Sequence, residues 1–476
     1  MHSRTHNEGL VVAEGGGLDP RSTYGRSLLA RCLDHARARG VVGPRVLILG
    51  AVKPDVDDPR AEVFLELGAA FVENLMAGDK GEGHAEAAAA IDRADVVFIR
   101  GGDQSRYVKF WMRSPVREAL RRVPGRGGVV IGSSAGCAVL SEWVYDALRG
   151  SLGGLDSLRD ARAPELTLTR PFLGYAKGVL FDTHFVERGR LPRLACMLGV
   201  LARPVVGVGI EASTSVVVSG EADDQIGEVV GEGVVTLLRG GEGWASLMPV
   251  GRPPAVLGLR MDVLAPGTRF RLRDGAVQSR PAWAAKSDHG EGQPEETSFA
   301  ACLVRGEAPE DAKAGLRYVM VEKDKPVLRD GQGKVPWLVL PGLWTQLPRA
   351  GAWMLMLRAM VEQPGAAMLV LDEGTNLDFG EDGGVRVSAA GESRAGSAVV
   401  VTSRGATYAG THGEHVYLEG LRLDVLPPGW AADLKHGGIE PSEGVTPEPV
   451  SDVGKHAEPD DDGDDDKDDE TPRATK

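Results

Sequence analysis

Short apolar runs alternate with amphipathic stretches along the first 275 residues. The runs have the length of buried strands, and the stretches between them have helical periodicity. Strand-like runs lie at 9–13, 45–50, 95–99 and 128–131, with amphipathic stretches at 27–39, 61–68 and 83–92. Strands alternating with helices indicate a parallel sheet covered on both faces. We therefore predict an α/β fold, a three-layer sandwich with a mainly parallel sheet, whose active site lies beyond the C-terminal ends of the strands.

The segment 129–140, VVIGSSAGCAVL, is a strand that turns sharply into a helix predicted from Ala135 to Val144. It contains the pattern G-x-S-x-G with Ser134 at its centre. In a nucleophile elbow this turn lifts one serine oxygen clear of the sheet, and the helix N-terminus offers amide groups to an oxyanion. The competing interpretation is a glycine-rich structural turn, because the pattern alone is weakly specific.

A serine nucleophile needs a base, and His184 follows a strand-like run in GVLFDTHF. Arg188, Arg190 and Arg193 come within ten residues of it. Guanidinium groups beside a nucleophile suit a substrate with several carboxylates. The alternative is a structural histidine followed by a basic helix start that pairs with Glu187 and solvent.

A second glycine turn, at residues 101–104, reads GGDQ and also ends a predicted strand. Such a loop could bring a backbone N–H toward an oxyanion and an amide side chain toward a substrate. A plain turn before the next helix is the competing interpretation.

The remainder of the chain divides into three parts. Residues 276–298 are polar and rich in turn residues, and we predict a linker there. Residues 299–437 form a smaller second segment, expected to be α+β. In it, 420–437 repeats 258–275 with more than half of the positions identical, and 369–379 weakly resembles 207–217. The segment is interpreted either as a partial, eroded copy of the later half of the first domain or as chance similarity.

Charge and composition exclude several classes of protein. The net charge is -14, and fourteen acidic residues against four basic ones lie from Gly437 onward, so we predict a disordered acidic tail over 438–476. The acidic balance argues against nucleic-acid binding. No apolar run could span a bilayer, and no signal-peptide core is found, so a cytoplasmic protein without a membrane partner is expected. The four scattered cysteines suggest neither a zinc site nor a disulfide framework.

Four motifs together resemble one family. GGDQ at 101–104, GSSAG at 132–136, DTHFVERGRLPRL at 182–194 and GVGIEASTSVVV at 207–218 are similar, in order and spacing, to the cyanophycinase family of serine peptidases. The resemblance covers residues 9–275. It implies a class I glutamine-amidotransferase-like α/β sandwich and hydrolysis of cyanophycin, a poly-aspartate with arginine on each side chain, to β-Asp-Arg dipeptides.

The resemblance also implies roles for single residues. Ser134 would be the nucleophile and His184 the general base, and the oxyanion would be bound by the N–H groups of Ala135, Gly102 and Asp103. The substrate pocket would be lined by Gln104, Asp182, Thr183, Arg188, Arg190 and Arg193. No metal or organic cofactor is implied, and a homodimer is one expectation, unless the second segment covers the dimer face.

Three positions depart from the family pattern. Ser133 replaces the usual threonine, Thr183 replaces the usual glutamine, and the usual Ile-Asp-Glu is Ile210-Glu211-Ala212. Glu211 must then be the orienting acid, or the triad is incomplete. Two alternatives therefore stay open: a peptidase for small aspartyl or isoaspartyl peptides, and a non-catalytic cyanophycin-binding homologue.

Overall fold

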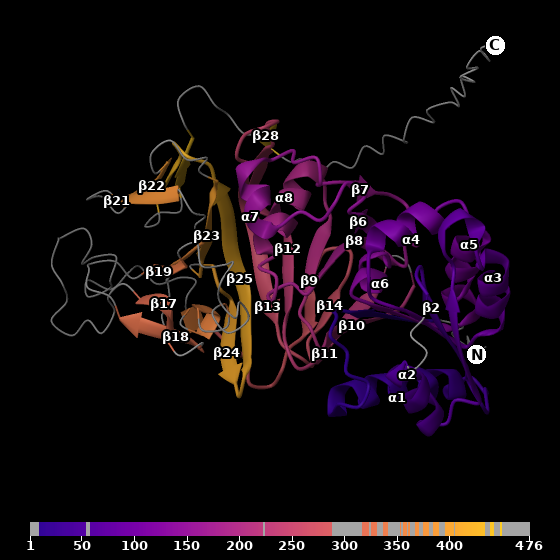
Figure 1. The fold of residues 1–476 in the computed structure, drawn as a ribbon. Helices are drawn as coiled ribbons and strands as arrows, with labels where there is room; N and C mark the ends of the chain where they lie inside the picture. The colour runs from indigo at the N-terminus through magenta and orange to yellow at the C-terminus, as the bar shows by residue number, and fades with distance from the viewer. Residues whose placement is uncertain are drawn as a thin grey trace, which may run out of the picture.

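The computed structural model describes residues 9–287 apart from 54–57 and 222–223, and between 317 and 449 it describes the strands and some of the residues that connect them. The described part contains two large sheets, one small sheet and the helices that pack against them (Figure 1). Within the predicted linker over 276–298, residues Val277–Ser279 and Ala285–Lys286 form strands. Within the predicted disordered tail over 438–476, residues Gly438–Glu440 and Glu448–Pro449 also form strands. Residues 288–298, Cys302 and the residues beyond 449 lie outside the described residues.

The first sheet has a parallel half and an antiparallel half. The parallel strands are, in spatial order, β1 (Leu10–Glu14), β5 (Val129–Ser133), β4 (Val96–Ile99), β2 (Arg45–Gly50) and β3 (Phe71–Met76). Beyond β1 the sheet continues through the antiparallel strands β10 (Thr214–Ser219), β11 (Ile226–Gly231), β14 (Arg269–Arg271) and β15 (Val277–Ser279). The parallel half carries the elbow at the C-terminal end of β5.

Helices cover both faces of the parallel half (Figure 1). One face carries α1 (Thr23–Ala38) and α2 (Pro59–Glu66), and the other carries α3 (His84–Arg93), α4 (Gln104–Trp111) and α5 (Pro115–Arg122). Side chains alternate between faces along each strand, so Val12 packs with Leu29 of α1, whereas Val11 belongs to the core that includes Leu120 of α5. The α/β class and its layered arrangement are confirmed.

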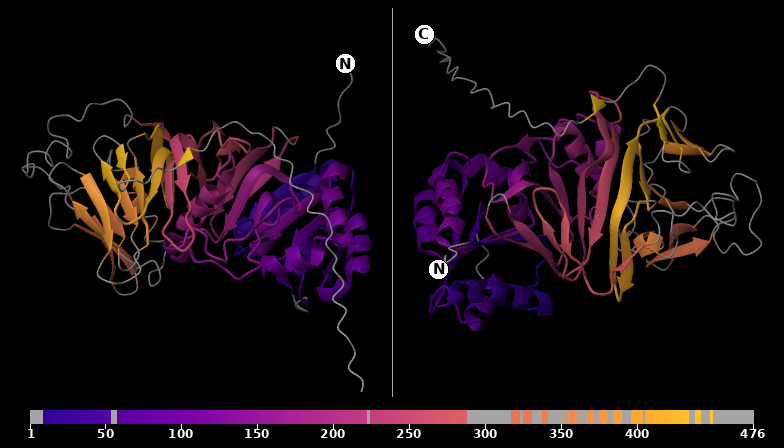
Figure 2. Two further views of the ribbon diagram at one scale, coloured as in Figure 1. Left: turned by 90° about the horizontal axis from the view of Figure 1, so that it is seen from above. Right: turned by 180° about the vertical axis from the view of Figure 1, so that it is seen from behind.

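The second sheet contains strands from both parts of the chain. From the first domain it takes β7 (Leu168–Thr169), β6 (Ser141–Tyr145), β8 (Ala176–Thr183), β9 (Val206–Ile210), β12 (Val235–Leu247) and β13 (Ala255–Leu264). It then continues through β25 (His415–Leu426), β23 (Ala398–Thr402), β20 (Ala367–Val370), β19 (Trp337–Leu340), β17 (Arg317–Glu322) and β18 (Lys325–Asp330). Figure 2 shows β25 running beside the strands of the first domain.

Smaller elements complete the fold. The helices α7 (Gly154–Arg159) and α8 (Leu191–Leu201) pack on the second sheet. β16 (Ala285–Lys286) pairs with β24 (Tyr408–His412), and β28 (Glu448–Pro449) pairs with β12. The small sheet has the order β21 (Thr375–Phe379), β22 (Gly384–Ala389), β26 (Ala431–Asp433) and β27 (Gly438–Glu440). In the described ranges, no helix is both long and apolar enough to cross a membrane.

One sequence prediction about the elbow is wrong. The helix predicted from Ala135 to Val144 is α6 (Ala135–Ala138), and the chain then enters β6 at Ser141. The run Trp143-Val144-Tyr145 has strand-forming side chains, and β6 pairs in parallel with β8, so sheet formation overrides the helical pattern.

Candidate active site

Ser134 stands at a strained turn between β5 and α6. Its φ is 52° and its ψ is -113°, values that a serine adopts only when its surroundings hold it there. A Cβ on Gly132 would lie 2.3 Å from the carbonyl oxygen of Gly136, and one on Gly136 would lie 2.3 Å from that of Ile99. Both glycines of the G-x-S-x-G pattern are thus required by close backbone contacts, as in a nucleophile elbow.

His184 faces Ser134 from the end of β8. Its Nε2 lies 3.0 Å from Ser134 Oγ, which is hydrogen-bond distance. The backbone N–H of His184 donates to the carbonyl of Gly15 at 2.8 Å, and Ser134 N–H donates to the carbonyl of Glu14 at 2.9 Å. The end of β1 therefore holds both residues of the pair.

A glycine next to β1 makes room for the imidazole. A Cβ on Gly16, whose φ is 113°, would lie only 2.2 Å from His184 Nε2. The run Gly15-Gly16-Gly17 follows β1 directly, and a glycine run after a strand is the sequence signal that could have placed it in the site.

The His184 imidazole is held in its neutral form. Burial lowers its pKa to about 4, with further lowering by Arg188 and Arg190, while Asp182 acts in the opposite direction. A neutral imidazole can accept the serine proton at neutral pH, as a general base must.

The structure does not bring Glu211 to His184. Glu211 Oε2 accepts from the backbone N–H of Val234 at 2.6 Å, and Oε1 has no partner among the described residues. Burial raises the pKa of Glu211 to about 8, so it is mostly protonated at neutral pH. The expectation that Glu211 orients the histidine is therefore not met, because its side chain extends toward the turn before β12 instead.

Two other glutamates, the buried Glu14 and the partly buried Glu187, accept hydrogen bonds from backbone near Ser134 and His184, and the sequence pattern does not indicate a catalytic role for either. Glu187 Oε1 accepts from the backbone N–H of Ala212 at 2.8 Å, and Glu14 Oε1 accepts from Gly16 N–H at 2.9 Å. Each has a second carboxylate oxygen that is buried without a partner among the described residues. Burial raises the pKa of Glu14 to about 7, with Ser133 and Gly16 N–H acting against it. From the sequence, Glu187 is predicted only as an ion-pair partner for the neighbouring arginines.

Two backbone segments lie next to Ser134. Ala135 is the first residue of α6, where an N–H has no intrahelical acceptor. From the other side the turn at Gly101 and Gly102 approaches, and a Cβ on Gly101 would lie 3.3 Å from Ser134 Cβ. Asp103 caps α4 by accepting from Ser105 N–H. This arrangement is compatible with an oxyanion hole formed by Ala135 and the glycine turn.

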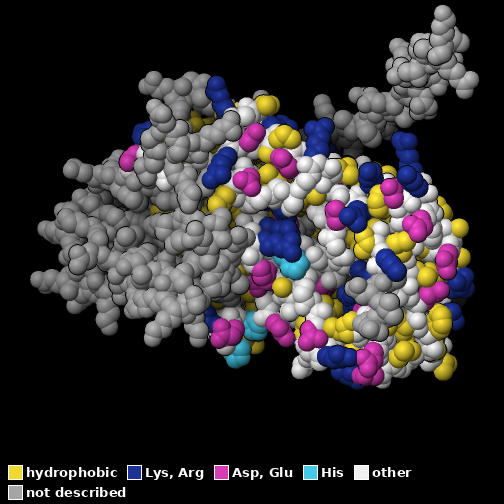
Figure 3. Space-filling model, in the orientation of Figure 1, with side chains coloured by type: hydrophobic (Ala, Val, Ile, Leu, Met, Phe, Trp, Pro, Cys, Tyr) yellow, Lys and Arg dark blue, Asp and Glu magenta, His cyan; other side chains and the backbone are white. Residues whose placement is uncertain are grey.

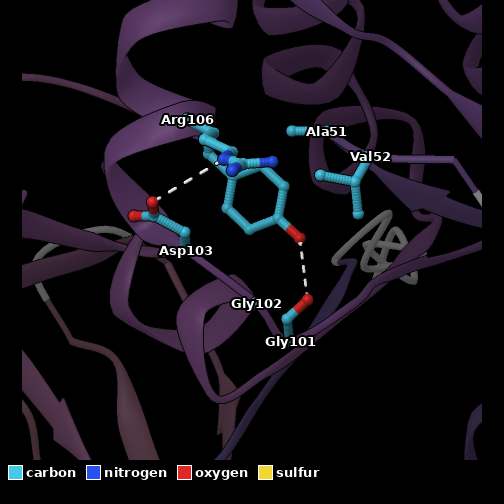
Figure 4. Close-up of a pocket in the computed structure, with 7 residues that line it drawn as sticks. Ala51, Val52, Gly101, Gly102, Asp103 and Arg106 are labelled. Carbon is cyan, nitrogen blue, oxygen red and sulfur yellow. Dashed lines mark hydrogen bonds and ion pairs between the residues drawn. The ribbon is translucent and has the colours of Figure 1, made fainter.

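A cavity of about 270 Å³ adjoins the glycine turn (Figure 4). It is lined by Ala51, Val52, Gly101, Gly102, Asp103, Arg106 and Tyr107. The Tyr107 hydroxyl donates to the carbonyls of Arg100 and Gly101, which fixes the turn. Arg106 and Asp103 form an ion pair of 3.7 Å at its rim. The cavity lies at the C-terminal ends of parallel strands, where ligands bind in such sheets.

The arginines of the predicted pocket differ in exposure. Arg193 is 1% exposed, its Nε donates to Asp182 at 3.1 Å, and its Nη2 donates to the same carboxylate. Arg190 is also buried and donates to Asp182 and to Thr183, and burial lowers its pKa to about 9. Arg193 thus cannot contact a substrate as predicted, because it neutralises a buried carboxylate at the end of β8.

Arg188 is the exposed member of this cluster and makes no ion pair with any described residue. The face seen in Figure 3 has basic side chains beside a histidine.

The other predicted pocket residues are held by contacts within the protein. Gln104 begins α4, and its Nε2 lies 3.5 Å from the carbonyl of Tyr145. Thr183 is buried, with its hydroxyl 3.3 Å from Arg190 Nη1. In the described part of the chain, no group of His, Cys, Asp or Glu side chains could hold a metal ion.

Comparison with known proteins identifies similar sequences. Residues 59–222 match the profile of peptidase family S51. The chain is 32% identical over 221 residues to a cyanophycinase of Trichormus variabilis, covering 45% of this chain and 70% of the relative. It is 29% identical over 292 residues to a cyanophycinase of Synechococcus elongatus, covering 59% of this chain and 84% of the relative.

Among solved structures, a peptidase from an acI-B1 Actinobacterium is 18% identical, with a TM-score of 0.38. It aligns with 56% of this chain and 97% of its own length.

Proposed function

Because the chain belongs to peptidase family S51, we propose that it is a serine peptidase of cyanophycinase type that hydrolyses multi-arginyl-poly-aspartate to β-Asp-Arg dipeptides through an acyl-enzyme. The observation that carries this proposal is the 3.0 Å contact between Ser134 Oγ and His184 Nε2 at a strained turn. The cyanophycinases named above support the choice of substrate.

In the proposed mechanism, Ser134 Oγ attacks an aspartyl backbone carbonyl while its proton passes to His184 Nε2. The N–H groups of Ala135 and the glycine turn stabilise the oxyanion. The C–N bond then breaks, and His184 gives the proton to the leaving amine. Water, deprotonated by the same imidazole, attacks the ester and releases the second product, which regenerates Ser134.

The proposed recognition of the substrate depends on Arg188. Its guanidinium is exposed next to His184 and is not neutralised by any described carboxylate. A planar guanidinium binds a carboxylate through two parallel hydrogen bonds. Asp182, Arg190 and Arg193 would not contact the substrate. They would instead fix the end of β8, from which His184 extends.

One observation favours a second candidate, a non-catalytic cyanophycin-binding homologue. No carboxylate among the described residues hydrogen-bonds to the His184 ring, and Ala212 stands where the family has a glutamate. A fluorophosphonate probe separates the candidates, since only a reactive Ser134 becomes labelled. The control is Ser134→Ala, which cannot be labelled at this position.

The test of the proposed function is incubation with insoluble cyanophycin, followed by mass spectrometry of the soluble fraction. We expect β-Asp-Arg from the unmodified chain and none from Ser134→Ala, with equal melting temperatures. Release of β-Asp-Arg by both proteins would overturn Ser134 as nucleophile. Release by neither, with probe labelling intact, would move the substrate to small aspartyl peptides.

A further inference from the structure

Twelve strands of the second sheet form one continuous path, and the arrangement of strands along it is the same when it is followed from either end. Its order is β18-β17-β19-β20-β23-β25 followed by β13-β12-β9-β8-β6-β7. Directions match as well: starting from each outer end, the successive pairs are antiparallel, parallel, parallel, antiparallel and antiparallel. Each of the six first-domain strands in this path (β6, β7, β8, β9, β12 and β13) thus has an equivalent in the C-terminal part.

The small sheet repeats the antiparallel half of the first sheet. β21, β22, β26 and β27 follow one another with the pairings of β10, β11, β14 and β15. The described residues contain no second equivalent of β1 to β5. The duplicated unit is therefore the half from β6 to β15, and its counterpart extends from β17 to β27.

The two halves meet about a pseudo-two-fold axis between β13 and β25. Arg260 lies directly opposite Arg422, which is its own counterpart in the repeated sequence GLR-DVL. Four of the other five pairs form symmetric couples: Val256 with Val425 and Val263 with Leu418, and Leu259 with Leu423 and Met261 with Leu421. The fifth pair, Asp262 with Glu419, follows a register shift after Met261 and has no symmetric equivalent. In a two-fold dimer, residue i of one subunit contacts residue j of the other, and residue j of the first contacts residue i of the second. Such an interface is called isologous, and the pairing of β13 with β25 resembles it.

One couple of buried side-chain contacts has the same symmetry. Gly258 N–H donates to Asp424 Oδ1 at 2.8 Å, and its counterpart Gly420 N–H donates to Asp262 Oδ1 at 2.7 Å. Both aspartates are buried, and both glycines have positive φ, 66° and 91°. Unrelated strands that paired by chance would not reproduce a buried Asp-to-Gly contact at both equivalent places.

The catalytic residues of the first half have no counterparts among the described residues of the second half. The strand equivalences place Leu340 at the position of Asp182, and the next residues in sequence are Pro341 and Gly342, where Thr183 and His184 follow Asp182. The described residues of the second half also contain no counterpart of the nucleophile elbow. The feature that the second half retains is the interface formed by β25.

We propose that residues 317–440 are a degenerate copy of residues 141–279 that occupies the place of a second subunit, so that the chain carries its own two-fold partner and remains monomeric. In this arrangement β25 covers the edge of β13, which would otherwise be open to pairing with another chain.

The test places cysteines on the pseudo-two-fold axis of the full chain. Arg260→Cys and Arg422→Cys would face each other in an antiparallel pair, where the Cα separation allows a disulfide. Cys302→Ser serves as background, because the other cysteines are buried. The double variant Arg260→Ser/Arg422→Ser controls for folding.

We expect light scattering of the unmodified chain to give one chain of 50.4 kDa. The double cysteine variant should oxidise within one chain, and Arg260→Cys alone should stay uncrosslinked. A two-chain mass for the unmodified protein, or a crosslinked dimer from Arg260→Cys alone, would show that another chain pairs at this edge and would overturn the proposal. So would a folded double variant that forms no disulfide.

Discussion

The backbone N–H of Ala212 donates to the carboxylate of Glu187 at 2.8 Å, so a glutamate from the turn after His184 contacts the backbone directly after Glu211. Glu211, one residue earlier, is turned away and is bonded to Val234 N–H. The histidine thus has a serine on one ring nitrogen and no hydrogen-bonded carboxylate from the described residues on the other.

Restoring an acid at position 212 should increase turnover. Ala212 lies beside the glycine run that contacts the imidazole, since a Cβ on Gly17 would be 3.3 Å from Ala212 Cβ. Ala212→Glu should therefore raise kcat on cyanophycin by at least about tenfold, given that an orienting acid contributes up to about 10⁴ in a comparable triad. It should also move the acidic limb of the pH profile to higher pH, because a carboxylate raises the pKa of His184 from about 4.

Ala212→Gln is the matched control, because it has nearly the same size but no charge. Equal kcat for the Glu and Gln variants would contradict an electrostatic role for this position.

Substitution of Gly16 should abolish activity without unfolding the protein. The Cβ of Gly16→Ala would lie 2.2 Å from His184 Nε2 and would displace the imidazole from Ser134. We expect kcat to fall at least about 100-fold, since small displacements of a catalytic group have effects of this size. Gly17→Ala is the control: its φ is also positive, 73°, but its Cβ would approach only Ala212. If both variants lose activity equally, backbone strain and not contact with the histidine is responsible.

Local patterns predicted the elements whose signals are contained in a few adjacent residues. Ser134 and His184 were found because each follows an apolar strand, and strand ends of a parallel sheet converge. Glu187 and Gly16 were missed as site residues because their roles depend on contacts with segments distant in sequence, at Ala212 and His184. The end of α6 at Ala138 was missed because its alternative, the pairing of β6 with β8, is also non-local.

Substitution of Arg188 should weaken substrate binding, whereas substitution of Arg193 should lower the stability of the protein. Arg188 is exposed, so Arg188→Ala should raise KM about tenfold through loss of a charged hydrogen bond to substrate and should leave the melting temperature unchanged. Arg193→Met should lower the free energy of unfolding by about 3 kcal/mol, because it leaves the buried Asp182 with one fewer cation. Kinetics on soluble aspartyl-arginine peptides and thermal melts measure the two effects. If Arg193→Met is as stable as the unmodified protein and only its KM is raised, Arg193 contacts the substrate as the sequence predicts.

The buried glutamates should make the protein less stable as pH rises from 6.5 to 8. Glu14 and Glu211 have pKa values of about 7 and about 8 in the fold, against 4.5 for an ordinary glutamate. The stabilisation associated with their bound protons is complete below pH 4.5 and is lost as pH rises through these values, at up to about 1.4 kcal/mol per pH unit for each group. The lowered pKa of His184 acts in the opposite sense, but only between about 4 and its ordinary 6.5. The melting temperature should therefore fall between pH 6.5 and 8.

Glu211→Gln should flatten this decline, since a glutamine oxygen can still accept from Val234 N–H but carries no titrating proton. Glu142→Gln is the control, because the pKa of Glu142 is lowered by Gly178 N–H and Arg170, against the effect of burial, and its contribution changes only at acidic pH. Melting curves at half-unit steps of pH measure both slopes. An unchanged slope in Glu211→Gln would mean that Glu211 is already ionised in the folded protein, where it would be a negative charge close to the active site.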